Sequence, residues 1–212
     1  MSGVPRVLAV SDAVSPVVYS NNFPGNLAPF DLVLSAGDLP GVVLEFVATK
    51  TRVAPLYVFG NHAVGYVRDP VTDEPRPPGG CVNVHLKVVE VAGLLVVGME
   101  GCLRYREGPH QYSQAAYRWM VVRLAPRLWW NRLRRGRAVD VLLTHAAPRG
   151  PHEGADHVHR GVAAFNLFHR LFRPRLHVHG HVHLSGANAP RSYVTAEGVR
   201  VVNAYEFTLV DL

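Results

Sequence analysis

Five apolar segments, each ended by small or polar residues, constrain the fold of this chain more than any other feature of its sequence. The segments are residues 6–10, 32–34, 56–59, 139–143 and 176–178. None of them alternates apolar with polar residues, which is typical of strands buried on both faces of a sheet. Helical patterns lie between them at 42–50, 113–124, 126–135 and 158–172. This alternation predicts an α/β fold.

Two further regions have the pattern of β-hairpins. Segments 84–91 and 94–97 flank Ala92-Gly93, segments 193–196 and 199–202 flank Glu197-Gly198, and a last strand is expected at 207–210. Glycine-containing pairs between apolar runs are typical of tight turns. Residues 68–80 are rich in proline and glycine around charged residues, so we expect an exposed loop there.

Length and composition limit the classes of protein to which the chain can belong. It has 212 residues, 48% apolar and 18% charged, so we expect residues 1–212 to form a single domain with a full core. No stretch approaches the ~18 consecutive apolar residues of a membrane-spanning helix, and no secretory leader pattern begins the chain. Cys81 and Cys102 show no paired spacing, so we expect a cytoplasmic protein with reduced thiols and no membrane partner.

Positive charge is carried almost entirely by arginine. The formal net charge is +6, and 20 of the 22 basic residues are arginine. Arginine binds phosphate bidentately, which favours a phosphate-bearing partner, although a GC-rich genome gives the same bias without a functional reason. Segment 118–137 interleaves arginines with three tryptophans. Such a segment can bind single-stranded nucleic acid, but we expect instead a pair of amphipathic helices that pack their tryptophans inward.

Polar side chains follow the apolar segments at the points where the predicted strands end. In an open α/β sheet such positions meet at the carboxyl edge of the sheet, where ligands bind. Oxygen and nitrogen donors without thiolate suit divalent ions such as Mn²⁺, Fe²⁺, Ni²⁺ or Zn²⁺. The candidate ligands are Asp12, Asp38, Asn61, His145, His181 and His183.

These candidates lie in five short motifs. The motifs are Ser11-Asp12-Ala13-Val14, Gly37-Asp38-Leu39-Pro40-Gly41, Gly60-Asn61-His62-Ala63, Thr144-His145-Ala146-Ala147-Pro148 and His179-Gly180-His181-Val182-His183. Their kind and order over residues 11–183 resemble the calcineurin-like metallophosphoesterases, whose pattern is Asp-x-His, Gly-Asp-x-x-Asp, Gly-Asn-His-Asp/Glu, a lone His and Gly-His-x-His. The resemblance implies a four-layer α/β/β/α sandwich of two mixed β-sheets flanked by helices.

The resemblance also implies a reaction. A metal-activated water would hydrolyse a phosphate ester at two divalent ions held about 3.5–4 Å apart, with the metal (Mn, Fe, Ni or Zn) left open by the sequence. Asp38 would bridge the ions, and His62 would protonate the leaving oxygen. Asp12 and His183 would complete the first site, and Asn61, His145 and His181 the second.

Three positions depart from the family pattern. Val14 replaces the histidine of the first motif, so the first ion should be held more weakly unless water or another side chain takes that place. Gly41 replaces the second aspartate of the second motif, and Ala63 follows Gly-Asn-His where the family has an acidic residue. Because that aspartate orients the histidine in relatives, the role of His62 is less fixed here.

The substrate is constrained more loosely. Asp156 and His159, in the polar segment 151–161 that follows the fourth motif, are candidates to contact it, and so is Arg104, which follows a predicted strand together with Tyr105 and Arg106. A diester is slightly favoured over a monoester because no cluster suited to a dianionic phosphate stands out. Two alternatives remain: a non-catalytic scaffold, by analogy with the retromer subunit that keeps this fold, and a nuclease or nucleic-acid-binding protein, which the charge favours.

Overall fold

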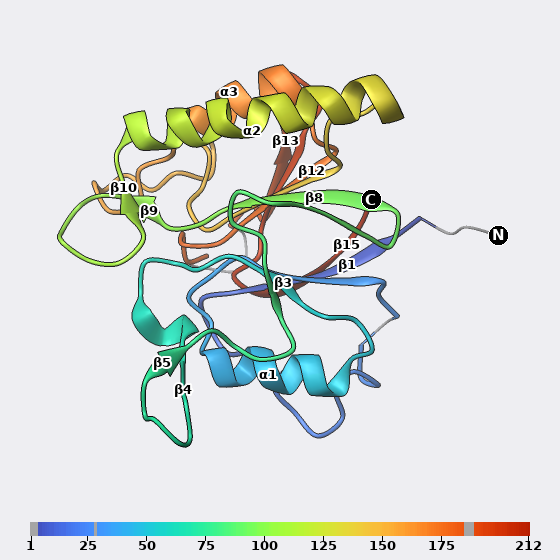
Figure 1. Cartoon of the computed structure of the whole chain (residues 1–212), viewed down its shortest axis with the longest axis vertical. Coiled ribbons are helices and arrows are strands. Elements are labelled where there is room, and N and C mark those ends of the chain that lie inside the picture. The colour runs from blue at the N-terminus through green and yellow to red at the C-terminus, as the bar shows by residue number, and fades with distance from the viewer. Residues whose placement is uncertain (1–3, 28, 185–188) are drawn as a thin grey trace.

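The chain folds into four layers of secondary structure. The computed structural model describes residues 4–27, 29–184 and 189–212. Helix α1 (Gly41–Lys50) covers one β-sheet, and helices α2 (Gln114–Arg135) and α3 (Ala163–Phe172) cover a second sheet that packs against the first (Figure 1). The predicted α/β/β/α sandwich of two mixed sheets is therefore confirmed.

The first sheet supplies three of the expected strand ends. Its order is β15 (Glu206–Asp211), β1 (Arg6–Ser11), β2 (Leu32–Ser35), β3 (Leu56–Tyr57) and β6 (Val82–Asn83). Strands β1, β2, β3 and β6 run parallel, and β15 pairs antiparallel with β1. Parallel strands end at the same edge, so the loops after β1, β2 and β3 lie together.

The second sheet repeats this plan. Its order is β13 (Ser192–Val194), β14 (Arg200–Asn203), β12 (Leu176–His179), β11 (Val141–Thr144), β8 (Leu94–Met99) and β7 (Val88–Val91). The four middle strands run parallel, and β13 and β7 are antiparallel edge strands. Both predicted hairpins are confirmed, since β7 joins β8 through Ala92-Gly93 and β13 joins β14 through Glu197-Gly198.

Short elements complete the chain. They are the 3₁₀ turn η1 (Ala63–Gly65) and the strand pairs β4 (Val67–Arg68) with β5 (Pro75–Arg76) and β9 (Cys102–Leu103) with β10 (Gln111–Tyr112). The predicted loop 68–80 is thus mostly a small exposed hairpin. Among the described residues no helix has the length and apolar character needed to cross a membrane.

Alternate residues of the buried strands pack into different hydrophobic cores. In β1, Val7 and Ala9 pack between the two sheets, whereas Leu8 and Val10 face α1. In β8, Leu95 and Val97 face α2 and α3. Strands covered on both faces need apolar residues throughout, which is why these segments show no polar alternation.

Helices α2 and α3 differ from the prediction. Residues 114–135 form one continuous helix with Pro126 inside it, because Leu124 and Leu128 on either side of the proline are buried in the same core. Helix α3 begins at Ala163 rather than at 158. The preceding residues are held in turns, because the Asp156 carboxylate accepts hydrogen bonds from the N–H groups of Val158 and His159.

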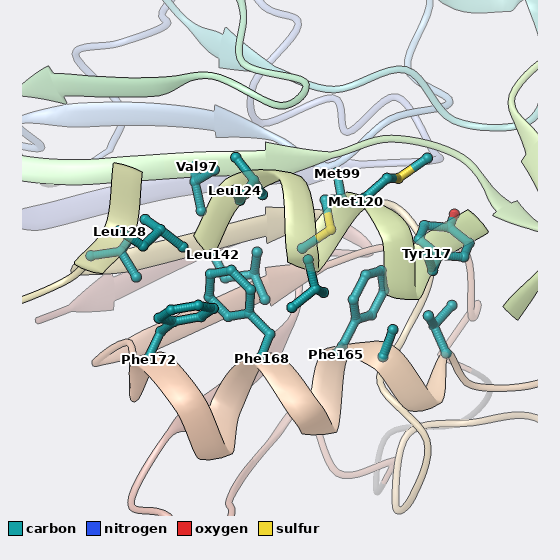
Figure 2. Packing of buried hydrophobic residues seen from close by; sticks show 14 of the residues in the cluster. Val97, Met99, Tyr117, Met120, Leu124, Leu128, Leu142, Phe165, Phe168 and Phe172 are labelled. Atoms are coloured by element: carbon teal, nitrogen blue, oxygen red, sulfur yellow. The ribbon is translucent and has the colours of Figure 1, made fainter. Parts of the chain in front are cut away.

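The expected inward packing of the tryptophans is wrong. Trp119, Trp129 and Trp130 are 65%, 44% and 48% exposed. The inner face of α2 is filled instead by Tyr117, Met120, Leu124 and Leu128, which pack against Phe165, Phe168 and Phe172 of α3 (Figure 2). Smaller apolar residues already complete this core, so the indoles of Trp119 and Trp130 lie on the outer surface, and that of Trp129 lies at the edge of the core, where it meets the Phe172 ring edge-on with centroids 5.8 Å apart.

A chain of buried histidines links α3 to the second sheet. Thr144 Oγ1 donates to the carbonyl of Ala146 and lies 2.8 Å from His177 Nε2, so that nitrogen donates to it. His177 Nδ1 is then an acceptor, and His169 Nε2 donates to it over 2.9 Å. Burial lowers the pKa of His169 to about 4 and that of His177 well below its ordinary value. Both rings are therefore neutral in the folded protein at pH 7.

These neutral histidines predict a loss of stability in acid. The pKa of His169 rises on unfolding, so its contribution is complete above about pH 6.5 and is lost as the pH falls towards 4. For this one group the loss between pH 8 and pH 5 is on the order of 2 kcal/mol. Urea unfolding measured across this range should show the free energy of unfolding falling accordingly.

The variant His169→Gln separates this effect from other acid-sensitive groups. Its amide nitrogen can still donate to His177 but does not titrate. The variant should lose less stability than the wild type between pH 8 and pH 5. Parallel pH dependence of the two proteins would contradict the assignment.

Candidate metal centre

The ends of strands from both sheets bring the motif residues to one place. From the first sheet, Asp12 follows β1, Asp38 follows β2 and Asn61 follows β3. From the second sheet, His145 directly follows β11, and His181 lies two residues after β12. The centre therefore lies on the seam between the sheets and draws ligand candidates from each.

Asp38 and His145 form the buried middle of this centre. His145 Nε2 lies 3.2 Å from Asp38 Oδ2, and its Nδ1 donates to the carbonyl of Ala36 over 2.8 Å. Burial alone would raise the pKa of Asp38, but hydrogen bonding with His145 and the backbone N–H of His62 leaves that pKa below its ordinary value. Burial lowers the pKa of His145, and the Asp38 interaction outweighs this and raises it.

Asn61 adds an oxygen at the same point. Its amide nitrogen donates to the Tyr105 hydroxyl over 3.1 Å, which leaves its Oδ1 directed at His145 Nε2, 2.9 Å away. Asp38 Oδ2 lies beside these two atoms. If His145 is neutral and carries its proton on Nδ1, all three atoms are hydrogen-bond acceptors. A proton on His145 Nε2 gives a hydrogen-bond donor to only part of this cluster, whereas a cation would bind all three acceptor atoms.

Asp12 connects the first sheet to the last motif. Its carboxylate accepts the backbone N–H of His181 at 3.0 and 3.2 Å, and His183 Nε2 lies 3.8 Å from Asp12 Oδ1. Burial lowers the pKa of His181 to about 3, so its ring is neutral at pH 7, the form that binds metals. The His181 Nε2 donates to the carbonyl of Val158.

Three of these residues have left-handed backbone conformations. The φ angles are 63° for Asp12, 51° for Asp38 and 67° for His181. Residues other than glycine rarely adopt such angles, and where they do the conformation costs about 1–3 kcal/mol each. Six other described residues besides glycine share this conformation elsewhere in the chain, but three within one cluster of polar side chains are typical of a functional site.

The motif glycines let the chains approach closely. A Cβ at Gly60 would collide with the Asp38 carboxylate, and one at Gly180 would collide with Ser11 Oγ. Gly37, with φ of 96°, leaves no room for a side chain beside His145. The glycines that precede Asp38, Asn61 and His181 are thus required by packing.

A cavity of about 250 Å³ opens above these residues. His62 stands at its rim, with a side chain 52% exposed and Nε2 3.8 Å from Asp38 Oδ2. The lining residues are Asp12, Asp38, Asn61, His62, Val64, Tyr105, Val158, His159, His181 and His183. His145 lies buried behind the Asp38 carboxylate.

The three predicted substrate contacts lie in different places. His159 lines the cavity, with its ring centroid 4.9 Å from that of His181. Asp156 holds His159 from outside, and hydrogen bonds from the side chain and backbone of His159 lower the pKa of Asp156 to about 2. Arg104 is not among the lining residues, and its guanidinium donates to the carbonyl of Gln111.

Comparisons with known proteins find similar solved structures at low sequence identity. No protein-family model and no curated protein matches the chain. The crystal structure of TT1561 of Thermus thermophilus matches with a TM-score of 0.59 at 16% identity, covering 98% of this chain and 94% of that one. Another solved structure matches with a TM-score of 0.62 at 14% identity, covering 98% and 95%.

Weaker matches are Vps29 complexed with zinc from Entamoeba histolytica and 5'-nucleotidase from Candida albicans. The first has a TM-score of 0.45 and 13% identity, covering 98% of this chain and 86% of that one. The second has a TM-score of 0.46 and 11% identity, covering 96% and 45%. Neither carries weight at these scores. What decides the fold is the two-sheet sandwich with five ordered motifs at its strand ends.

The chain has the calcineurin-like metallophosphoesterase fold. One departure from the family pattern has a packing reason. Gly41 begins α1, where a Cβ would come within 2.6 Å of the Val67 side chain and 2.7 Å of the Gly65 carbonyl oxygen. The aspartate found there in relatives would not fit, so in this chain the nearest carboxylate to His62 is the one on Asp38.

The donor set fits a divalent metal ion. One ligand atom from each of Asp12, Asp38 and His145 lies within 4.8 Å of the others. Asn61 Oδ1 faces the same point, and His183 lines the cavity beside Asp12. Two carboxylates and neutral imidazoles are the ligands expected for Mn²⁺, Fe²⁺ or Zn²⁺.

Tyr105, which the sequence places after a predicted strand together with Arg104, is a polar residue of the cavity lining. Its hydroxyl accepts from Asn61, and its ring meets that of His157 edge-on, with centroids 6.3 Å apart. Tyr105 follows β9 in a loop that carries no family motif. Only its position after a strand, shared with Arg104, indicates that the loop approaches the cavity.

The packing of Gly60 gives a prediction. In Gly60→Ala the new methyl group would displace the Asp38 carboxylate, and the affinity for Mn²⁺, measured by calorimetry, should fall by about tenfold or more. Gly79→Ala is the control, because its Cβ would lie 3.2 Å from a Glu45 oxygen, far from the cavity. Unchanged Mn²⁺ affinity in Gly60→Ala would show that Asp38 does not bind the ion.

Proposed function

We propose that this chain is a metal-dependent phosphoesterase that hydrolyses a phosphate ester at the cavity between its two sheets, with residues 1–212 acting as a single domain. The observation that carries the proposal is the convergence of Asp12, Asp38 and His145, whose ligand atoms lie within 4.8 Å of one another. The two unpaired cysteines favour a reducing, cytoplasmic setting.

Two ions are proposed, with ligands assigned from the family motifs. Asp38 would be the shared ligand, because its carboxylate is grouped with a proposed ligand of each ion, Asp12 and His145. Asp12 and His183 would hold the first ion, and Asn61, His145 and His181 the second. When bound, the ions supply an activated water as nucleophile and neutralise charge on the phosphoryl oxygens.

His62 is placed to donate the proton that the leaving oxygen needs. Its backbone N–H donates to Asp38 Oδ1 over 2.9 Å, which fixes the main chain, while the ring stays exposed at the cavity rim. Histidine is the side chain that most often serves as a general acid in enzymes.

A diester is the favoured substrate. Among the described residues that line the cavity there is no lysine or arginine, and the basic contacts available to a phosphate are histidines. A terminal phosphate carries an extra negative charge that such a lining neutralises poorly. His159 and Tyr105 are the proposed contacts for the substrate beyond the metal ligands.

The first ion should be the more weakly held. Val14 supplies no donor, and His159 is the cavity histidine that could take its place, since its Nδ1 bonds Asp156 and leaves Nε2 free. Without His159, the first ion would have only Asp12, Asp38 and His183 as its protein ligands. Manganese, which tolerates oxygen-rich sites, is the proposed ion for reconstitution.

The rival functions differ in what they require of the cavity. A scaffold would bind metal without turnover, and a nuclease would cleave polynucleotides with the same metal ligands. The lining of the cavity is explained by metal and phosphate-ester binding alone, without a groove for a polynucleotide. The turnover experiment below separates the first rival from the proposal.

Substitution of Asp38 tests the proposal directly. Protein reconstituted with Mn²⁺ should hydrolyse bis-p-nitrophenyl phosphate faster than p-nitrophenyl phosphate, and Asp38→Asn should abolish both reactions without unfolding the chain. Asp73→Asn is a matched control, because Asp73 also has a left-handed backbone, with φ of 57°, but lies exposed in the β4–β5 hairpin. Wild-type turnover in Asp38→Asn would refute the assignment, and Mn²⁺ binding without turnover in the wild type would favour a scaffold.

Substitution of His62 tests the proton donor. His62→Ala should slow the hydrolysis of alkyl phosphodiesters by about 10²- to 10⁴-fold, because their leaving groups need protonation. Loss on p-nitrophenyl esters should be much smaller, since p-nitrophenolate leaves without a proton. Equal losses in kcat on both kinds of ester would assign His62 to phosphate binding or to structure instead.

A further inference from the structure

Helix α2 presents an apolar stripe to its outer side. The stripe, hereafter the outer stripe, consists of Trp119, Val122, Pro126, Trp129, Trp130 and Leu133. Spacings of three and four residues place them on one helix face over about 21 Å. Leu133 is 81% exposed, and all six residues are exposed to more than a third.

The hydrophobic core beneath α2 is complete without the outer stripe. Met120, Leu124 and Leu128 lie on the opposite face of α2 and are buried between the helix, α3 and the second sheet (Figure 2). Helices α2 and α3 together form the outer layer on their side of the molecule (Figure 1). A single helix therefore has two apolar faces, one of which is already fully used.

Arginines flank the outer stripe on both sides. Arg118 lies on one flank, and Arg123, Arg127 and Arg134 lie on the other. The guanidinium of Arg134 lies 4.5 Å from the centroid of the Trp130 ring. Among the described residues, none of these four arginines has a carboxylate within 4.0 Å.

The surroundings of the outer stripe contain little negative charge. The sequence has no Asp or Glu from residue 108 to residue 139, which includes the whole of α2, or from residue 157 to residue 196, which includes α3. The ion pairs of this region lie at the C-terminal end of α2, where Arg135 bonds Glu90 and Arg137 bonds Asp140. Positive charge along the rest of the helix is left for an external anion.

We propose that the outer stripe of α2 binds the surface of an anionic lipid bilayer. A helix with apolar and tryptophan side chains on one face and arginines beside them lies in the plane of a membrane interface, with the apolar face among the acyl chains and the cations at the headgroups. The flanking arginines complement a negative surface. This binding is peripheral and agrees with the lack of a membrane-crossing helix among the described residues.

Other occupants fit less well. Bases of a single-stranded nucleic acid stack on aromatic rings, but Val122, Pro126 and Leu133 have no aromatic ring. A second copy of the chain would bring its own arginines against those of the first, and like charges oppose such contact. The proposal departs from the expectation of no membrane partner, because that expectation rests on the lack of a membrane-spanning segment, which peripheral binding does not need.

Tryptophan fluorescence reports on this surface alone, because the three tryptophans of the chain all lie in the outer stripe. Vesicles that mix phosphatidylglycerol with phosphatidylcholine should shift the emission to the blue and carry the protein down on centrifugation. Vesicles of phosphatidylcholine alone should do neither, and high salt should weaken binding to the mixed vesicles.

Variants show whether the stripe itself makes the contact. Leu133→Gln and Trp119→Gln should each lower the partition coefficient by about tenfold or more. Val71→Gln is the control, since Val71 is 91% exposed in the β4–β5 hairpin. Arg123→Gln with Arg127→Gln should weaken binding and its salt dependence, whereas Arg52→Gln, near α1 on the opposite layer, should change neither. Unchanged thermal melting would show that each variant is folded.

Three results would overturn the proposal. One is no blue shift with anionic vesicles at low salt. Another is quenching by a thymidine oligonucleotide with no response to vesicles, which would identify a nucleic-acid surface. The third is a dimer in sedimentation that Leu133→Gln dissociates, which would identify a second copy as the partner.

Discussion

Two buried carboxylates at the seam between the sheets are the interactions on which the centre of this structure depends. Asp12 and Asp38 both extend from the first sheet, and both find their partners on the second: the backbone N–H of His181 for Asp12 and the His145 ring for Asp38. Charges removed from water are costly unless they are paired. The motif glycines, the left-handed backbone angles and the close approach of the strand ends all serve to bring these partners into reach.

Much of this arrangement can be predicted from the sequence, because the physics at these positions is local. Uninterrupted apolar runs such as 139–143 indicate strands covered on both faces, and a polar residue directly after each run indicates a position at the sheet edge. The Ala92-Gly93 turn can be predicted in the same way, since both residues adopt the left-handed angles that a tight hairpin requires. The motif residues that line the cavity are found in this way.

What cannot be predicted depends on contacts between distant segments. Pro126 suggests a helix end, but packing of Leu124 and Leu128 against α3 keeps α2 continuous. The tryptophans have the right spacing for a core, yet the core is filled from the opposite face of the same helix. Tyr105 joins the centre through a hydrogen bond with Asn61, which no sequence spacing encodes. The steric reason for Gly41 likewise lies in residues 65–67, which are remote in sequence.

The central claim is that the cavity on the seam holds divalent metal ions. It is tested most directly by diffraction from crystals soaked in Mn²⁺, with data collected on both sides of the manganese absorption edge. The account predicts anomalous density inside the cavity, in contact with Asp38 and with donors from both sheets. An absence of anomalous density there, at a Mn²⁺ concentration that fills sites elsewhere on the protein, would contradict it.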